Sequence, residues 1–495
     1  MLLTEIELRD ALGDWARRDL PVYVALADAV AGLAMDGRVP VGVRLPAERR
    51  LAQVLNVSRG TVVAAYDRLR EQGLVRTRHG SGTVVADGSL HLSGPRDEHL
   101  TASLARNTIF ASFLGDPGDL VDLRGAYWVG ADELPRAAFT HSAGELDTML
   151  EDHGYHPAGL PALREAIAQR LTETGLETTA EQVLVCTGAQ QAITLVSELV
   201  LSPGDCALVE ELTFAGALDA FASAEARVRV TPMGAKGVDP AALADHLRRL
   251  RPRLAYLIPA HNPTGVVLPT LARRRIAEAA AAWDGVLVED LTLAETQREG
   301  TIPPPIAAFA TAETGATILT LGSLSKLMWG GLRMGWIRGP EPVIQRLARL
   351  KALVDLGTPL LDQAVAARLM EDIDAIRKDR VAGLAERGAV IGDALRRDLP
   401  EWRFAEPESG LCLWVQLPGG ASSIEFASLA LCHGVAVVPG TVSAPGGGAT
   451  DRLRIPFGQR PDVLEEGVRR LAAAWREWTG LGAPRPLPDV LSYPG

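Results

Sequence analysis

The chain has 495 residues, which is too long for one hydrophobic core and favours two or three domains. Its 47% apolar and 22% charged residues are ordinary for a globular protein. No apolar run reaches the roughly 18 residues that cross a bilayer, and the N-terminus is acidic where a signal peptide is basic. Four scattered cysteines without a C-x-x-C pair argue against disulfides and structural zinc. We therefore expect a cytoplasmic protein with no membrane contact and no metal.

The charge is distributed unevenly along the chain. The whole chain carries a formal charge of −11, but residues 38–85 hold nine arginines against three acidic residues, a net charge of +6. The remainder therefore carries about −17. A basic module on an acidic body is typical of a DNA reader attached to another domain.

Residues 20–86 have the pattern of a small DNA-binding domain. Hydrophobic periodicity and turn residues predict three helices and then two short strands: Pro21–Met35, Glu48–Leu55, Arg59–Gln72, Leu74–Arg78 and Thr83–Ala86. Ser58 is a good N-cap for the third helix, and the basic hairpin has its tip at His79–Gly82. Helix, helix, turn, helix and hairpin describe an α+β winged helix-turn-helix.

Four motifs in this region carry a resemblance. Leu45–Ala52, Val57–Val62, Gly73–Leu74 and His79–Thr83 resemble the GntR family of bacterial regulators in order and spacing. The resemblance implies that double-stranded DNA is contacted by the following residues: Arg49, Ser58, Arg59 and Thr61, with Gly80 in the wing. Arg59 and Thr61 open the predicted recognition helix, where side chains reach base edges.

Two positions depart from the GntR pattern. Gly60 stands where a hydroxyl is common and Val63 where an arginine is common, so we expect fewer base contacts. The alternative for this region is a small helical domain with a solvated charged face.

Residues 87–118 are predicted to be a linker. They are rich in turn residues and lack periodicity, with one short amphipathic piece at residues 103–113. A spacer of this length lets the flanking domains sit at variable distance.

Residues 119–480 alternate apolar strands with helices. The predicted strands are Val183–Cys186, Cys206–Val209, Arg227–Val230, Leu254–Ile258, Val286–Val288 and Ala316–Leu321, and helices such as Ala189–Leu201 and Leu271–Trp283 separate them. This pattern predicts an α/β fold with a mainly parallel sheet covered on both faces. Ligands of such sheets bind beyond the carboxyl ends of the strands.

A lysine follows the last of these strands. Lys326 is one of four lysines in a chain with 46 arginines. A partly buried lysine can lose its proton and attack a carbonyl, which an arginine cannot do. Ser323, Ser325 and Arg333 beside it suit a phosphate, so the stretch suggests pyridoxal phosphate held as a Schiff base. The alternative is a lysine that extends from a strand end into solvent.

Other strand ends carry groups that suit the same cofactor. Thr187–Gln191 opens a helix whose amides can bind phosphate, and Phe214 can stack on a planar ring. Asn262 can donate to a ring oxygen, and a buried Asp290 needs a cationic partner such as a protonated pyridine nitrogen. Arg454 suits a carboxylate. Taken singly, these are also explained as a tight turn, a core ring and a surface arginine.

Together with Tyr155 and Gly159–Arg164, these motifs resemble fold type I, class I/II aminotransferases over some 350 residues. The resemblance implies Lys326 as the internal aldimine, Asp290 on the pyridine nitrogen, Asn262 on the 3′ oxygen and Phe214 on the ring face. It implies Ala189, Gln190, Ser323, Ser325 and Arg333 around the phosphate, Arg454 on a substrate carboxylate, and Tyr155 reaching the phosphate across a homodimer interface.

Thr292 departs from the aminotransferase pattern. Relatives usually have a tyrosine two or three residues after the aspartate, where its phenol shares the 3′ oxygen. Thr292 is therefore expected to leave the cofactor bound but poorly tuned for turnover.

A GntR-like winged helix joined to an aminotransferase-like body is the architecture of the MocR/GabR-type regulators. We therefore predict a multidomain transcription regulator that uses pyridoxal phosphate and senses a small amino compound by aldimine exchange at Lys326. The alternative is a working amino acid aminotransferase with an accessory DNA-binding domain. A third possibility is a sensor of pyridoxal phosphate alone, which the presence of Arg454 disfavours.

Overall fold

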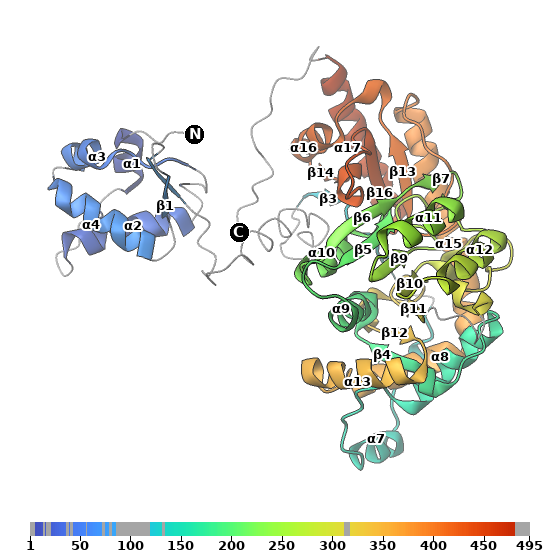
Figure 1. Cartoon of the computed structure of the whole chain (residues 1–495). Coiled ribbons are helices and arrows are strands. Elements are labelled where there is room, and N and C mark those ends of the chain that lie inside the picture. Colours follow the sequence, from blue (N-terminus) through green and yellow to red (C-terminus); the bar gives the residue numbers. More distant parts are fainter. Residues whose placement is uncertain are drawn as a thin grey trace. The chain divides into compact units, whose positions relative to one another are not determined.

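The computed structural model describes residues 5–12, 15, 21–35, 39, 43–55, 57–71, 75–78, 82–85, 119–130, 134–310 and 317–480. These residues belong to two compact units that divide near residue 101, and each unit is described by itself (Figure 1). The predicted linker, residues 87–118, and the wing residue Gly80 lie outside the described residues. Among the described helices, none has both the length and the apolar composition to cross a membrane.

The first unit is a small helical domain with a two-stranded hairpin. Its elements are α1 (Glu5–Leu12), α2 (Val22–Met35), α3 (Glu48–Leu55), α4 (Arg59–Glu71), β1 (Val75–Arg78) and β2 (Gly82–Val85), and the two strands pair antiparallel. The last three helices and both strands follow the predicted elements closely, whereas α1 was not predicted. The winged helix-turn-helix prediction is thus confirmed.

Buried side chains from the helices form the core of this unit. Leu26 of α2, Leu51 of α3 and Leu69 of α4 are fully buried together. Tyr66 of α4 is buried with them, and its hydroxyl donates a hydrogen bond to the carbonyl oxygen of Pro46 at 3.0 Å. This bond fixes α4 to the residues that lead into α3.

The second unit is built on a seven-stranded sheet with the order β4-β12-β11-β10-β9-β5-β6. The strands are β4 (Val183–Cys186), β12 (Gly335–Arg338), β11 (Thr317–Ser323), β10 (Val286–Asp290), β9 (Leu254–Leu257), β5 (Cys206–Glu210) and β6 (Arg227–Thr231). Only β12 is antiparallel to its neighbours, β11 and β4, among these strands. The predicted α/β fold with a mainly parallel sheet is confirmed.

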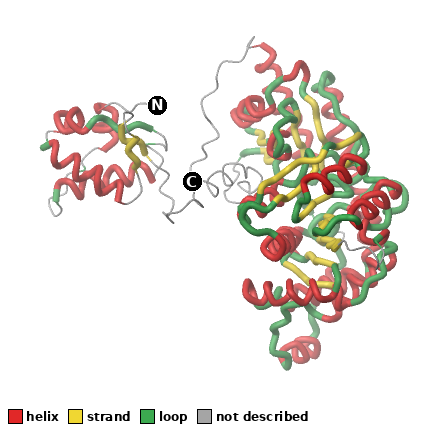
Figure 2. Tube along the Cα trace, in the orientation of Figure 1, coloured by secondary structure: helices red, strands yellow, loops and turns green. Residues whose placement is uncertain are grey.

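Helices cover both faces of this sheet, as Figure 2 shows. On one face, Val209 and Tyr256 pack in a core with α9 (Gly188–Val200), α10 (Ala215–Ser223) and α13 (Glu341–Asp355). On the other face, the neighbouring residues Leu208 and Ala255 pack with α11 (Pro240–Leu250) and α12 (Thr270–Ala281). Successive strand residues point to opposite faces, which explains why these strands are apolar throughout.

The C-terminal part of this unit has its own core. A three-stranded sheet of β13 (Cys412–Gln416), β16 (Arg452–Pro456) and β15 (Val438–Pro439) packs with α15 (Ile373–Asp398), α16 (Ser423–Cys432) and α17 (Pro461–Gly480). Trp402, Phe426 and Trp475 meet edge to face at the centre of this core, with ring centroids 5.4–5.5 Å apart. This core holds β16 rigidly, and β16 carries Arg454.

The remaining elements are shorter or peripheral. They are β3 (Val121–Asp122), which pairs with β14 (Val435–Ala436), the hairpin of β7 (Met233–Gly234) and β8 (Gly237–Val238), and the helices α7 (Ala143–Leu150), α8 (Pro161–Glu173) and α14 (Leu360–Glu371).

The Tyr66 hydrogen bond gives a testable prediction about the first unit. Tyr66→Phe should destabilise that unit by about 1–3 kcal/mol, because the Pro46 carbonyl loses its partner in a buried setting. Hydrogen exchange of the α3 and α4 amides in the full chain measures the loss. Tyr23→Phe is the control, since Tyr23 is exposed and should change stability by less than about 0.5 kcal/mol. Equal protection in both variants would contradict the assignment.

Candidate functional site

Lys326 lies in the turn that follows β11. Its Nζ donates a hydrogen bond to the carbonyl oxygen of Ala126 at 2.7 Å. Burial lowers the pKa of Lys326 to about 8, and the positive charge of Arg454 contributes in the same direction. A larger fraction of this amine is therefore neutral near pH 7 than in a solvent-exposed lysine, which is what a nucleophilic amine requires.

The register of three neighbouring strands brings two predicted phosphate motifs together. Ser323, the last residue of β11, pairs with Gly335 of β12. Gly335 in turn pairs with Cys186, the last residue of β4, and the start of α9 follows at Gly188. The approach is so close that a Cβ on Gly335 would lie 2.7 Å from the carbonyl carbon of Gly188. A glycine is therefore required where β12 passes α9.

Several hydrogen-bond donors gather where these strands end. Ser323 Oγ donates to Ser325 Oγ at 3.1 Å, and both side chains are buried. Arg333 donates from Nη2 to the carbonyl oxygen of Thr187 at 3.1 Å, with its guanidinium against Gly188. The first amides of α9 are at the same place. Hydroxyls, a guanidinium and free helix amides together suit a phosphate.

A buried carboxylate ends β10 at the same edge of the sheet. Asp290 Oδ2 accepts from the Tyr256 hydroxyl at 2.5 Å, and Oδ1 accepts from the Thr292 amide at 2.8 Å. Burial, and then the Asp290 charge, raises the pKa of Tyr256 well above 10, so its hydroxyl stays a donor. The remaining lone pairs of Asp290 suit a protonated ring nitrogen.

The preceding residue of β10 is a second buried carboxylate, and a different set of groups satisfies it. Glu289 accepts from the amides of Ile306 and Ala307 and from the Thr320 hydroxyl, at 2.6–3.0 Å. Its neighbour Asp290 points to the opposite face, so these two acidic residues do not share one partner.

Asn262 and Arg454 are in contact, although they are almost 200 residues apart. Arg454 is buried on β16 and donates from Nε to Asn262 Oδ1 at 3.3 Å and from Nη1 to the Arg124 carbonyl oxygen at 3.0 Å. The Cys412 thiol of β13 lies near Arg454 and Lys326, and burial raises the pKa of that thiol. The structure thus adds Cys412 to the site, although no sequence motif singles it out.

Phe214 and Gln190 complete the set. Phe214 precedes α10, and its ring would lie 2.6 Å from a Cβ on Gly216, so the glycine makes room for the ring. Gln190 Nε2 donates to the carbonyl oxygen of Gly216 at 2.8 Å, which links α9 to the Phe214 turn. Ala189 follows Gly188 in the first turn of α9.

Gln190 Oε1 and Thr292 Oγ1 are among the buried side-chain atoms of the described residues that have no hydrogen-bond partner. An unpaired buried polar atom costs free energy, so both are candidates to bond a bound molecule. Phosphate donors, a carboxylate for a ring nitrogen, an aromatic ring and a lysine amine together fit pyridoxal phosphate.

Tyr155 lies apart from these residues. It is 62% exposed, its amide donates to His153 Nδ1 at 3.0 Å, and its ring stacks on that imidazole. Within the described part of one chain, no hydrogen bond joins Tyr155 to the residues above. Its predicted role across a subunit interface stays a prediction.

In the first unit, the predicted DNA-contacting residues lie at the start of α4 and on α3. Ser58 Oγ accepts from the Thr61 amide at 3.1 Å, which makes Ser58 the N-cap of α4. Arg49 and Arg59 are exposed, and Arg59 Nη2 lies 3.5 Å from Glu48 Oε2. An exposed ion pair of this kind is weak, so Arg59 can readily exchange Glu48 for a phosphate or a base.

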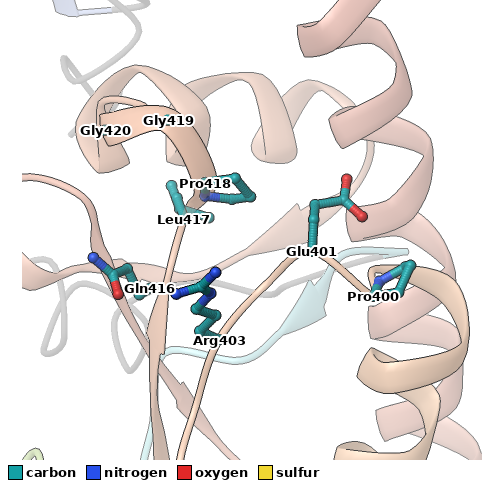
Figure 3. Close-up of a pocket in the computed structure, with 8 residues that line it drawn as sticks. All are labelled: Pro400, Glu401, Arg403, Gln416, Leu417, Pro418, Gly419 and Gly420. Carbon is teal, nitrogen blue, oxygen red and sulfur yellow. The ribbon is translucent and has the colours of Figure 1, made fainter.

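Two cavities of similar volume are not lined by Lys326. One of about 460 Å³ is formed around Arg403 and Gln416, which Figure 3 shows beside the Pro418–Gly420 turn. Another of about 460 Å³ is lined by Thr264, Trp414 and Arg452, among others. None of the predicted site residues lines either cavity.

Comparison with known proteins matches both parts of the chain. The model of the family described as aminotransferase class I and II matches residues 132–471, and that of the bacterial regulatory proteins of the gntR family matches residues 22–85. The uncharacterized HTH-type transcriptional regulator YisV of Bacillus subtilis is 29% identical over 480 residues, which cover 93% of this chain and 97% of YisV. The probable rhizopine catabolism regulatory protein MocR of Rhizobium meliloti is 29% identical over 418 residues, 80% of this chain and 81% of MocR.

The body of the chain also matches enzymes. The 2-aminoadipate transaminase of Thermus thermophilus is 34% identical over 298 residues, 59% of this chain and 75% of the enzyme. The crystal structure of LysN from Thermus thermophilus, an alpha-aminoadipate aminotransferase complexed with N-(5'-phosphopyridoxyl)-L-leucine, matches with a TM-score of 0.68 at 29% identity, covering 78% of this chain and all of LysN. The chain therefore belongs to the class I and II aminotransferase family, and its N-terminal GntR domain gives it the architecture of the MocR-type transcriptional regulators.

Proposed function

We propose that the protein is a pyridoxal-phosphate-dependent transcription regulator that binds an operator through its GntR domain and senses a small amino compound at Lys326. The observation that carries the proposal is the combination, in one chain, of a GntR domain with a lysine of lowered pKa beside a phosphate-binding set of donors. Its site of action is the cytoplasm, as for a protein that binds chromosomal DNA.

Different residues are proposed to bind the phosphate and the ring nitrogen of the cofactor. Ser323, Ser325 and Arg333, with the first amides of α9, would hold the phosphate, and Asp290 would hold the ring nitrogen. Pyridoxal phosphate, when bound, supplies an electrophilic carbon that amines attack. Lys326 would place the amine of the protein at that carbon, where the amine of an effector would also bind.

Arg454 defines the class of effector. A buried guanidinium without a carboxylate partner among the described residues is costly, and its hydrogen bonds to Asn262 and Arg124 leave donors free. A planar fork of donors suits a carboxylate. We therefore propose that the effector is an amino acid or a similar compound with both an amine and a carboxylate.

Binding alters transcription only if the effector binds two arrangements of the protein with different affinity. The proposed difference lies at Lys326, whose amine would be bound to the cofactor in one arrangement and free in the other. The freed amine has a pKa of about 8 and can take up a proton. A charge then forms in a buried site beside Arg454, which favours a rearrangement of the surrounding groups.

A homodimer is part of the proposal. Large apolar side chains are exposed on α7, at the end of α13 and at the start of α14, namely Leu146, Leu150, Leu353, Val354, Leu356 and Leu361. An exposed apolar group of this kind marks an interaction surface, and identical chains usually pair through the same surface. Tyr155 is exposed as well, as a residue that reaches into a partner subunit must be.

The second candidate is an aminotransferase, which the 34% identity to 2-aminoadipate transaminase favours. Lys326 and Asp290 are available for such a reaction. The difference is Thr292, whose buried hydroxyl offers one short donor where a phenol is usual in the family. We propose that this exchange weakens turnover while it keeps cofactor binding.

The assignment of Lys326 is tested by reductive trapping. Borohydride should fix pyridoxal phosphate on Lys326, and the yield should rise as the pH increases through about 8, because only the neutral amine attacks. Lys326→Ala should abolish the adduct and the response of operator affinity to a panel of amino acids. Lys378→Ala, a change at an exposed lysine, is the control. A surviving adduct on Lys236, Lys351 or Lys378 would move the site.

The assignment of α4 as the recognition helix is tested with Arg59. Arg59→Ala should weaken specific DNA binding by about 1–3 kcal/mol, as for the loss of one good base contact. The steep salt dependence should persist, because the other arginines still release counterions. Arg248→Ala removes an equal charge at an exposed position of α11 and should leave the affinity for the operator unchanged. Unchanged operator affinity in Arg59→Ala would refute the assignment.

The choice between regulator and enzyme is tested at Thr292. In the wild type, an amino acid should shift the cofactor spectrum readily, while transfer of its amino group to a keto acid is slow. A missing hydrogen bond to developing charge often costs on the order of 10²-fold in rate, so Thr292→Tyr should speed the transfer if the ring fits. Thr292→Val, which replaces only the hydroxyl by a methyl group, should not speed this transfer. Rapid multiple turnover by the wild type would instead establish the aminotransferase.

A further inference from the structure

An ion pair between a fully buried lysine and a partly exposed aspartate lies at the end of α13, outside the set of residues proposed to bind the cofactor. Lys351 is fully buried, and its Nζ lies 2.7 Å from both carboxylate oxygens of Asp355. Lysines are scarce in this chain and are rarely fully buried in proteins. A surface helix would be held as well by an apolar residue at this position, so the pair calls for a further role.

The carboxylate of this pair is bonded to the start of α9. Asp355 Oδ2 accepts from Gln191 Nε2 at 2.7 Å. Gln191 Oε1 in turn accepts from the Thr187 amide at 2.8 Å. The carbonyl of Thr187 accepts from Arg333, so both peptide groups of Thr187 are held by side chains.

The ion pair determines which way the Gln191 amide faces. A glutamine amide can place either its oxygen or its nitrogen toward a neighbour, but an ionised carboxylate only accepts hydrogen bonds. Asp355 therefore turns Nε2 toward itself and leaves Oε1 for the Thr187 amide. Although burial opposes ionisation, hydrogen bonds from Lys351 and Gln191 lower the pKa of Asp355 below its usual value. Lys351, which bonds to both oxygens of Asp355, thus holds the ionised carboxylate in the position from which it orients the amide.

Thr187 is the N-cap of α9, the helix whose first amides are proposed to bind the phosphate. Gly188 follows it with a φ of +81° and begins α9. The first amides of that helix have no acceptor within the helix, and their direction depends on how the preceding peptide is held. A Gln191 side chain with the opposite orientation would present an amide donor to the Thr187 N–H and would push the turn away.

We propose that Lys351 and Asp355 are positioning residues for the phosphate, acting through Gln191 on the first turn of α9. This inference rests on the proposed function, since it takes pyridoxal phosphate as the ligand. The pair sets affinity for the phosphate group and not for the pyridine ring, which Asp290 would contact from the end of β10 and Phe214 from the turn before α10.

A purely structural role is the competing explanation. Asp355 Oδ1 also accepts from the Gly357 amide at 3.0 Å, and the backbone of Gly357 packs tightly on that of His156. Loss of the pair could therefore loosen the whole end of α13. A structural loss would weaken binding of every ligand of the site, whether or not the ligand carries a phosphate.

The test compares pyridoxal phosphate with pyridoxal, which lacks the phosphate, on the full-length apoprotein. Asp355→Asn should weaken the affinity for pyridoxal phosphate roughly tenfold, about the effect of one lost hydrogen bond to a charged group, and leave that for pyridoxal unchanged. Lys351→Met/Asp355→Asn should do the same without leaving a buried charge unpaired. Lys378→Met should change neither affinity. Equal losses for both ligands, or no loss, would overturn the inference.

A double-mutant cycle tests the route through Gln191. If Asp355 acts through the Gln191 amide, Asp355→Asn should cost little once Gln191→Met is present, so the two effects on pyridoxal phosphate affinity are not additive. Additive effects would overturn the route. If the wild-type protein binds neither pyridoxal phosphate nor pyridoxal, the proposed function itself is refuted. If the wild type binds pyridoxal phosphate and the variants bind it equally well, only the role of Lys351 and Asp355 is refuted.

Discussion

The register of β11, β12 and β4 is the constraint on which the site depends. It puts Ser323, Gly335 and Cys186 in one row, so that the turns after β11 and β4 meet although more than 130 residues separate them. A shift by one residue would turn every side chain of β12 to the opposite face. The close approach of Gly335 to Gly188 leaves no room for such a shift. The groups proposed to bind the phosphate are thus brought together by the sheet.

Burial and hydrogen bonding then give the assembled groups their chemistry. Lys326 loses part of its preference for the charged form, because it is buried beside the cationic Arg454. Asp290 accepts hydrogen bonds from Tyr256 and the Thr292 amide, and these two donors fix the direction in which its carboxylate faces. An amine that readily loses its proton suits a reactive carbonyl, and a carboxylate held by two donors suits a protonated ring nitrogen.

Much of this site could be predicted from the sequence, because its chemical groups follow apolar strands. Lys326, Asp290 and Asn262 each lie at or just beyond the end of a strand, and parallel strands end at one edge. Tyr256 and Cys412 could not be found in this way, since both lie within buried strands and look like core residues. Gln191 belongs to the phosphate motif, but its bond to Asp355 depends on how α13 packs on α9. Contacts between distant elements leave no local pattern.

Compared with the aminotransferase pattern, this chain keeps the residues expected to bind cofactor and amino acid and differs at Thr292, a position expected to affect turnover. Holding a cofactor and an amino acid requires contacts in the ground state, and in the proposed function Ser323, Arg333, Asp290 and Arg454 supply them. Catalysis requires further contacts that are stronger in the transition state than in the ground state. We propose that Thr292, where a tyrosine is usual in the family, lacks a contact of that second kind, while the contacts of the first kind are kept. A sensor needs an effector that binds and stays, so slow turnover is an advantage there, whereas in an enzyme it would be a defect.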